Sequence, residues 1–402
     1  MTYALIIPVF LALALAPATL LVREPSPAPP RRRALAVLGL SFAVLAVLTA
    51  VFDNLMIAAG FFDYGAGHIT GLRVGLVPVE DFAYPLAGLL LLPSLWWGLA
   101  ERGRLAATVR TLVATSRPVS WVNTAFPFAA AYVMTTGRLD LPLVVGTLFF
   151  LFPYNLLMYG INDVFDHESD LLNPRKGGAE GALVDRSEHR MILVGSVLLA
   201  LPFLAFLFPV GGAAAAWVLV VSLFAVAAYS LKGLRFKEVP FLDSATSATH
   251  FVSPAVYGLV LAGADGSAGT VALCAGFFLW SMASQAFGAV QDVRADREAG
   301  LGSIATVLGA RPTVWAAAAF YLAAGLLLLF VPWPGPVASL LVLPYLANLV
   351  PYLSVTDADC ERAHRGWRRF LWLNYVTGAL VTLLLNWAWI LEHGSGGAAP
   401  GP

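Results

Sequence analysis

The sequence predicts an all-α integral membrane protein with about twelve transmembrane helices, and three observations lead to this fold class. Hydrophobic residues make up 59% of the 402 residues and charged residues only 12%, against about 45–50% and about 25% in soluble domains. Apolar runs near the ~20 residues that one bilayer-spanning helix needs recur along the chain. Basic residues gather in alternate loops between these runs. A soluble globular enzyme is therefore excluded.

Twelve apolar runs mark the expected helices. They lie near residues 3–22, 34–52, 80–99, 118–135, 140–162, 191–208, 212–230, 240–262, 269–290, 313–331, 336–353 and 370–391. No Lys or Arg precedes the first run, whereas Arg23 follows it. This arrangement favours an uncleaved helix over a signal peptide.

The basic residues test this arrangement, because cytoplasmic loops retain Lys and Arg. If alternate loops are cytoplasmic, they hold 22 of the 24 basic residues, and only Arg73 and Arg138 lie on the other side. We therefore expect a multi-pass cell-membrane protein, in contact with membrane lipid, whose two termini are extracytoplasmic. The formal net charge is zero, so no basic surface for nucleic acid is expected.

A polar stretch divides the chain into two expected domains. Residues 1–100 form a three-helix unit, residues 101–116 a cytoplasmic linker and residues 117–393 a nine-helix unit. The tail, 394–402, is rich in Gly, Ala and Pro and is expected to be disordered.

Two acidic motifs stand at expected cytoplasmic helix ends, where carboxylates indicate function. The first comprises Asn162, Asp163, Asp166 and Asp170, whose i, i+3, i+7 spacing places the three carboxylates on one helical face. Such like charges are tolerable around a divalent cation, and oxygen ligands suit Mg²⁺ bridging to phosphates. The second comprises Asp292 and Asp296. Both motifs are predicted to reach the same membrane face.

Basic residues in the neighbouring loops are candidates for neutralising a diphosphate. The candidates are Arg175, Lys176, Lys232, Arg235 and Lys237. The positive-inside rule explains each of them equally well.

The combination of two acidic motifs with basic residues in the neighbouring loops resembles the UbiA superfamily of intramembrane prenyltransferases. The resemblance extends from about Ser116 to Leu391. The resemblance rests on Asn162-Asp163-x-x-Asp166-x-x-x-Asp170, Asp292-x-x-x-Asp296 followed by Arg297 and Gly300, Tyr229-Ser-Leu-Lys232-Gly-Leu-Arg235, and Arg117-Pro118. It implies a nine-helix bundle in which the five aspartates of the two motifs hold Mg²⁺ and a prenyl diphosphate. The resemblance also implies that Asn162 is a catalytic residue. Substrate is expected to be bound by Arg117, Asn155, Arg175, Lys176, Lys232 and Arg235. Ionisation would give an allylic cation that alkylates an electron-rich acceptor, within walls that include Phe149, Phe150 and Tyr154.

The first hundred residues are similar to one subunit of the three-helix, heterodimeric lycopene cyclases, through Asp53-Asn54 and Pro78-Val79-Glu80-Asp81. The similarity implies that an acidic residue protonates a polyene, and that a second cyclase subunit is required. Glu80 is the expected acid, since burial would keep it protonated. The alternative is that Glu80 and Asp81 only cap the third helix.

A half-cyclase joined to a prenyltransferase predicts transfer of a dimethylallyl group from dimethylallyl diphosphate to lycopene. An aromatic prenyltransferase of quinone synthesis is one alternative, but it leaves the first unit unexplained. A transporter is another, although the acidic residues gather at one face instead of at mid-membrane. A third is that the first unit only docks lycopene.

Overall fold

The computed structural model describes residues 31–65, 67, 69–100, 103–167 and 184–393, with positions 7, 11 and 14. It divides the chain into two compact units, residues 1–111 and 112–402. The division falls inside the stretch 101–116, which is largely helical because α4 runs from Gly103 to Thr115. The predicted first span, 3–22, and the tail, 394–402, lie outside the described residues apart from those three positions.

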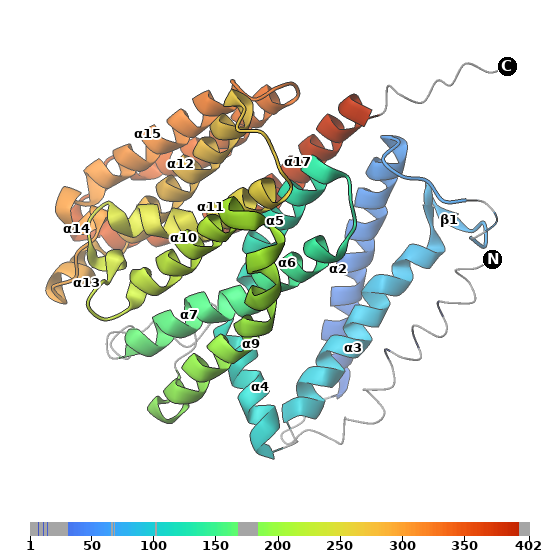
Figure 1. The fold of residues 1–402 in the computed structure, drawn as a ribbon, viewed down its shortest axis with the longest axis horizontal. Coiled ribbons are helices and arrows are strands. Elements are labelled where there is room, and N and C mark those ends of the chain that lie inside the picture. Colours follow the sequence, from blue (N-terminus) through green and yellow to red (C-terminus); the bar gives the residue numbers. More distant parts are fainter. Residues whose placement is uncertain are drawn as a thin grey trace. The chain divides into compact units, whose positions relative to one another are not determined.

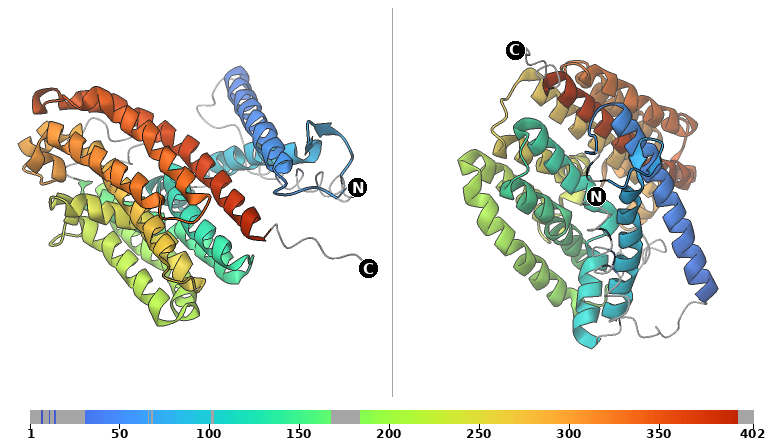
Figure 2. Two further views of the ribbon diagram at one scale, coloured as in Figure 1. Left: turned by 90° about the horizontal axis from the view of Figure 1, so that it is seen from above. Right: turned by 90° about the vertical axis from the view of Figure 1, so that its right-hand side faces the viewer.

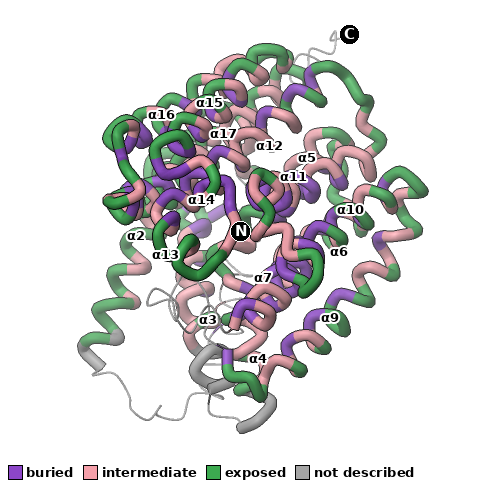
Figure 3. Tube along the Cα trace, turned by 90° about the vertical axis from the view of Figure 1, so that its left-hand side faces the viewer, coloured by how far each residue is buried: buried purple, intermediate pink, exposed green. Residues whose placement is uncertain are grey.

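Between residues 31 and 100, the described part of the first unit contains two long helices joined by a short hairpin. Helix α2 (Arg31–Ala58) is followed by β1 (Arg73–Val74), β2 (Val77–Pro78), the 3-10 turn η1 (Val79–Phe82) and α3 (Ala83–Ala100). The two strands are antiparallel and pair Arg73 with Pro78. No residue of the most apolar part of α2 is buried within the described structure, as the exposed and intermediate colours of Figure 3 show. Large apolar side chains such as Leu35, Leu40 and Val47 are exposed along this helix.

The second unit is a helical bundle (Figure 1). Its first half holds η2 (Pro118–Ser120), α5 (Trp121–Thr136), α6 (Leu141–Leu151), α7 (Pro153–Phe165), η3 (Arg186–Glu188), α9 (His189–Val210), α10 (Gly212–Ser230), η4 (Phe236–Glu238) and α11 (Leu242–Leu261). Its second half holds α12 (Ala268–Val290), α13 (Val293–Glu298), α14 (Ile304–Leu308), α15 (Ala310–Leu328), η5 (Gly335–Val342), α16 (Leu343–Leu349), η6 (Val350–Tyr352), η7 (Asp357–Arg362) and α17 (Ala363–His393).

The two halves have separate apolar cores. Phe128, Phe150, Tyr154, Leu219 and Tyr257 belong to the first core, between α5, α6, α7, α10 and α11. The second lies where α12 packs along α15, α16 and α17, and it holds Phe287, Tyr321, Tyr345 and Phe370. Helices α12 and α15 run side by side in Figure 1, and α17 extends along the bundle in Figure 2.

Proline interrupts two of the predicted spans. The expected run 140–162 is two helices, because α6 ends at Leu151 and Pro153 begins α7. The expected run 336–353 is divided among η5, α16 and η6, where Pro336, Pro344 and Pro351 occupy early helical positions.

Within the described residues, eight helical segments are long and apolar enough to cross a membrane. Helices α3, α5 and α11 also lie at predicted spans but are not among the eight. Helix α5 has only 16 residues, and α11 carries buried polar side chains such as Asp243, Ser244 and His250. The all-α, multi-pass fold class is confirmed, whereas the total of twelve spans stays a prediction.

Candidate active site

The first acidic motif lies at the end of α7, where two of its carboxylates are buried. Asp163 is 2% exposed and Asp166 is 5% exposed. Asn162 donates one hydrogen bond to Asp166 Oδ2 (2.6 Å) and one to Ser230 Oγ (3.0 Å). Because Ser230 is the last residue of α10, this amide ties the ends of α7 and α10 together.

Helix α7 ends before the last residues of the first acidic motif. Its last residue is Phe165, and Asp166 is the C-cap with φ −101° and ψ 0°. That the three carboxylates share one helical face therefore stays a prediction. Asp170 lies outside the described residues, as do Arg175 and Lys176.

Three cationic side chains surround the two buried carboxylates. Arg117 Nη2 lies 2.7 Å from Asp163 Oδ1, and its guanidinium stacks 4.2 Å from the ring centre of Tyr159. Arg235 Nη2 lies 3.6 Å from Asp166 Oδ1, and Lys237 Nζ forms an ion pair with Asp166 Oδ2. Buried carboxylates need such partners, since removing one partner of a buried ion pair typically costs about 3–5 kcal/mol.

Both arginines have an unusual backbone conformation. Arg117 has φ 50° and Arg235 has φ 43°, in the left-handed region that residues with a Cβ seldom adopt. At each of these arginines the chain changes direction, and the side chain contacts a buried carboxylate, Asp163 or Asp166. Such strain persists where the surrounding structure holds it, and it is frequent at functional sites.

The loop 231–241 connects the first acidic motif with the second. On one side it supplies Arg235 and Lys237 to Asp166. On the other side, an added Cβ at Gly302 would overlap the carbonyl oxygen of Glu238. Asp243, which follows the loop, accepts a hydrogen bond from the backbone N–H of Ile304 (3.0 Å). The residues just after the second motif therefore pack on the loop that contacts the first.

Gly302→Ala should destabilise this junction by about 1–3 kcal/mol, the usual cost of overpacking, because a backbone carbonyl yields less than a flexible side chain. Thermal unfolding of the purified protein would measure the loss. The matched control is Gly378→Ala in α17, where nothing lies within 4 Å of an added Cβ. Equal unfolding temperatures for the two variants would contradict the close packing.

The second motif occupies a break between α12 and α13. Helix α12 ends at Val290, Asp292 is the N-cap of α13, and Asp296 lies within α13. Both carboxylates are partly exposed. The neighbouring Arg297 donates to Thr306 O (2.9 Å) and to Asp357 Oδ2 (2.5 Å), which fixes the turn against α14 and η7. The motif is thus held in place by its basic neighbour.

Two predicted substrate-binding residues have other surroundings. Asn155 is fully buried, and its amide donates to Thr124 Oγ1, Phe150 O and Leu151 O, so it holds the junction of α6 and α7 instead of facing the carboxylates. Lys232 is exposed, whereas Lys237 contacts Asp166. Both lysines lie in the same loop, and the sequence alone does not show which of them contacts Asp166. The expected aromatic walls Phe149, Phe150 and Tyr154 are fully buried in the first core.

The donor set is compatible with Mg²⁺. In the described part of the chain, no three His, Cys, Asp or Glu side chains are close enough to hold a metal ion. Mg²⁺, however, is commonly held by one or two carboxylates together with substrate phosphates and water. The all-oxygen side chains at the end of α7 meet that requirement, with three cations nearby to receive the phosphates.

A second polar cluster lies in the first unit, around η1. Glu80 Oε1 accepts a hydrogen bond from the backbone N–H of Thr70 (2.5 Å), and Tyr64 donates to Asp81 Oδ2 (2.6 Å). Glu80 and Asp81 are both buried, each 7% exposed. That burial keeps Glu80 protonated stays a prediction.

Comparison with known proteins identifies the family. The sequence model of the UbiA prenyltransferase family matches residues 124–376, more than half of the chain and wholly within the second unit. The chain belongs to the UbiA prenyltransferase family. The predicted resemblance is thus confirmed, and the protein is a prenyltransferase.

Two relatives of this UbiA-family chain have closely similar sequences. The "C(50) beta-cyclic carotenoids biosynthesis protein LbtBC" of Dietzia sp. (strain CQ4) is 50% identical over 398 residues, covering 90% of this chain and 92% of the relative. The "Lycopene elongase/hydratase" of Corynebacterium glutamicum is 49% identical over 277 residues, covering 69% of this chain but 96% of the relative. Roughly the remaining third of this chain therefore has no counterpart in the Corynebacterium glutamicum relative.

Solved structures support the same fold. A UbiA homolog from Archaeoglobus fulgidus bound to DMAPP and Mg²⁺ has a TM-score of 0.50 and 19% identity, covering 66% of this chain and 98% of the homolog. A digeranylgeranylglyceryl phosphate synthase structure has a TM-score of 0.52 and 14% identity, covering 71% and 99%. At these identities the likeness concerns the fold alone.

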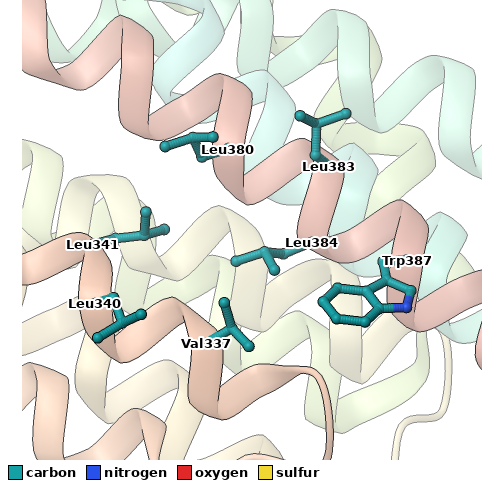
Figure 4. Close-up of a pocket in the computed structure, with 7 residues that line it drawn as sticks. All are labelled: Val337, Leu340, Leu341, Leu380, Leu383, Leu384 and Trp387. Carbon is teal, nitrogen blue, oxygen red and sulfur yellow. The ribbon is translucent and has the colours of Figure 1, made fainter. Parts of the chain in front are cut away.

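Two apolar grooves on the UbiA-type unit are separate from the acidic motifs. One of about 290 Å³ lies between η5 and α17 and is lined by Val337, Leu340, Leu341, Leu380, Leu383, Leu384 and Trp387 (Figure 4). Another of about 710 Å³ lies between α11 and α12, next to Val256 and Phe278. The lining of neither groove includes an acidic-motif residue. The first is lined by apolar side chains alone, and the second includes one acidic side chain, Asp265.

Proposed function

We propose that the second unit transfers a dimethylallyl group from dimethylallyl diphosphate to an end of lycopene. The observation that carries this proposal is the junction of two acidic motifs with Arg117, Arg235 and Lys237, in a chain that shares 49% identity with nearly the whole of a protein named lycopene elongase/hydratase. An aromatic acceptor remains the second candidate for this site. The two relatives, whose names specify carotenoids and lycopene, do not support an aromatic acceptor.

Mg²⁺ is the proposed cofactor, and its proposed ligands are Asp163, Asp166, Asp170, Asp292 and Asp296. The ion supplies Lewis-acid stabilisation of the departing diphosphate when bound. The Archaeoglobus fulgidus homolog, which shares the fold, binds Mg²⁺ together with DMAPP. Asn162 orients Asp166 through the hydrogen bond between their side chains.

The three cations have a second role in this proposal. Arg117, Arg235 and Lys237 neutralise the buried carboxylates in the structure, and the same side chains bind diphosphate oxygens when substrate is present. A guanidinium suits this exchange because its donors match carboxylate and phosphate equally well. Arg175 and Lys176 are proposed to join them.

Lys237→Met should lower kcat/KM for the prenyl diphosphate by about 10- to 100-fold, the usual value of one charge-assisted hydrogen bond. Lys232→Met is the matched control, since that lysine is exposed in the same loop, and it should leave kcat/KM unchanged. The measurement is the rate of elongation at varied diphosphate concentration. Equal losses in the two variants would show that the loop acts only through its net charge.

The proposed chemistry balances without an external oxidant or reductant. The bond from the dimethylallyl carbon to the diphosphate oxygen breaks, and its electron pair leaves with the diphosphate. The terminal alkene of lycopene supplies the pair for the new carbon–carbon bond, which leaves a tertiary cation. Loss of a proton gives an alkene, and addition of water gives an alcohol. The elongase/hydratase name of the Corynebacterium relative covers both outcomes.

We further propose that the first unit is half of a lycopene cyclase and that it needs a second cyclase subunit. The relative that matches 90% of this chain has a name that specifies cyclic carotenoids, whereas the shorter relative is named for elongation and hydration. The apolar, unburied faces of α2 are a suitable surface for a partner helix. A non-catalytic docking role is the alternative for this unit.

The proposed orientation places the prenyltransfer site at the cytoplasm and both termini outside. It rests on the distribution of Lys and Arg among the loops. Cysteine accessibility at Lys232 and Arg138 in intact cells would test it, with labelling expected only at position 138.

Expression in a lycopene-accumulating host tests the proposed function. We expect carotenoids heavier than lycopene by one C5H8 unit per transfer, or by one such unit and one water where hydration follows. Unchanged lycopene alongside a prenylated quinone precursor would favour the aromatic alternative. Elongated but acyclic products in the absence of a second subunit are expected.

A further inference from the structure

The larger apolar groove, of about 710 Å³, lies between α11 and α12 of the second unit. Its volume is within the range of about 300–1,000 Å³ that small-molecule sites occupy. Most of its lining is hydrocarbon, including Val252, Val256, Val260, Val271, Phe278 and Leu279. Asp265 and Thr270 belong to the end where the two helices connect. The groove is therefore suited to a long apolar ligand.

The two helices that form this groove also lead to both acidic motifs. Helix α11 begins at Leu242, directly after the loop 231–241 that contacts Asp166, and α12 ends at Val290, just before Asp292. These consecutive helices are joined by a short loop and pack against each other, so they are antiparallel. The junction of the acidic motifs thus lies at one end of the helix pair, and the connecting residues 262–267 lie at the other.

A hydrogen bond between α11 and α12 marks the inner end of the groove. Ser247 donates to Gln285 Oε1 at 3.1 Å. Both residues lie between the junction and the first lining residues of the groove, Val252 and Leu279. On the junction side α11 carries the buried Asp243, whereas beyond the hydrogen bond the lining is predominantly apolar. The surface of the helix pair therefore changes from polar to apolar at this point.

The lengths along these helices match a long, stiff ligand. Val252 follows Asp243 by nine residues and Leu279 precedes the end of α12 by eleven, so the groove begins about 14–17 Å from the junction at ~1.5 Å per residue. Its lining extends about a further 12–14 Å along the two helices. Together these lengths reach roughly 30 Å, the thickness of a bilayer core. The conjugated chain of lycopene is stiff and about as long as that core.

We propose that the groove between α11 and α12 binds the distal half of the acceptor polyene while its other end reacts at the junction of the acidic motifs. This assignment rests on the prenyl transfer proposed above. In this arrangement the terminal unit of the polyene passes the Ser247–Gln285 hydrogen bond and reaches the junction. The groove then sets the depth at which a long acceptor is held.

The physics of the membrane favours a polyene over a lipid chain in this groove. Lipid is as apolar as the groove lining, so the hydrophobic effect supplies no affinity there, and close packing has to supply it. A stiff polyene loses less conformational freedom on binding than a flexible acyl chain does. The better-packed and less flexible occupant is therefore the polyene.

Cys274 on α12 lines the groove and is a native probe of its occupancy. The chain has two cysteines, and the other, Cys360, is only 1% exposed. In vesicles of saturated phosphatidylcholine, lycopene at ten times its Kd should slow the labelling of Cys274 by N-ethylmaleimide about tenfold, without donor or Mg²⁺. Lipid chains are present with and without lycopene. An unchanged labelling rate would show that they fill the groove and would overturn the proposal.

A protein with Cys274→Ala and Val221→Cys is the matched control for this labelling. Position 221 is 54% exposed on α10 and lines neither groove. Lycopene should leave the labelling of this position unchanged. Equal slowing at positions 221 and 274 would reveal a general effect of lycopene on the membrane, and would also overturn binding in the groove.

Val256→Trp tests the same groove through turnover. The larger side chain should raise the KM for lycopene by about 10-fold or more, the usual effect of a size change in an apolar pocket. The KM for dimethylallyl diphosphate should stay unchanged, and Val221→Trp should match the wild type in both constants. If thermal unfolding shows that Val256→Trp does not fold, the labelling of Cys274 in the wild type still decides the assignment.

The two experiments separate this proposal from the function on which it rests. Absence of elongated product from the wild type would overturn the proposed prenyl transfer to lycopene. Elongation by the wild type, with Cys274 unprotected and a wild-type KM for lycopene in Val256→Trp, would overturn the groove assignment alone.

Discussion

Asp163→Asn should lower prenyl transfer by roughly 10²–10³-fold, the range seen when one preorganised electrostatic group is removed from an active site. The substitution keeps the size of the side chain but removes the charge that pairs with Arg117 at 2.7 Å. It also removes a proposed Mg²⁺ ligand. Initial rates of elongation with purified protein and dimethylallyl diphosphate measure the effect.

The matched control for this change is Glu392→Gln, at an exposed position near the end of α17. It should retain the wild-type rate and the wild-type dependence on Mg²⁺. Thermal unfolding of Asp163→Asn distinguishes a catalytic loss from a folding defect. A folded Asp163→Asn protein with wild-type turnover would refute the assignment of this carboxylate.

A chain that begins at Gly103 should keep prenyl transfer to lycopene and lose ring formation completely. This start preserves α4, which continues into the second unit, where Leu112 packs against Gly195. The Corynebacterium relative matches over 96% of its own length without a counterpart to the remaining third of this chain. Prenyl transfer is therefore expected to need only residues 103–402.

Carotenoids from cells expressing the full and shortened chains, each with a complementary cyclase subunit, measure both activities. The full chain should yield elongated cyclic products and the shortened chain elongated acyclic ones. Loss of elongation in a shortened chain that still folds would instead indicate that the first unit delivers lycopene, which is the docking alternative.

Hydropathy alone located most helices, because membrane-spanning segments have to satisfy their backbone internally and be apolar outside. The runs at 191–208 and 212–230 correspond to α9 and α10. The exceptions have local causes. Pro153 divides one run into α6 and α7, and the helix that carries Asp163 stops at Phe165.

The site was predictable in its residue types but not in its pairings. Acidic residues at helix ends are visible in a sequence, and Asp163 and Asp166 do come together with cations. The choice of Lys237 over Lys232 depends on the course of a loop in which Arg235 has a left-handed backbone. Spacing does not encode that course.

The hydrogen-bond partners of the first unit's acidic residues were the least accessible part. Glu80 and Asp81 are adjacent, both buried, and equivalent in a sequence. Glu80 accepts from the backbone N–H of Thr70, whereas Asp81 accepts from the hydroxyl of Tyr64. These donors come from a loop in which the Asn54 amide bonds the hairpin. Only the folded chain shows these different partners.

Incubation of the purified protein with lycopene, Mg²⁺ and isotopically labelled dimethylallyl diphosphate tests the central claim most directly. Mass spectrometry of the carotenoid fraction should show the label in products one or two C5 units larger than lycopene. It should show none after chelation of Mg²⁺. Unlabelled lycopene, together with label in an aromatic acceptor offered in the same mixture, would contradict the proposed substrate while leaving the UbiA fold intact.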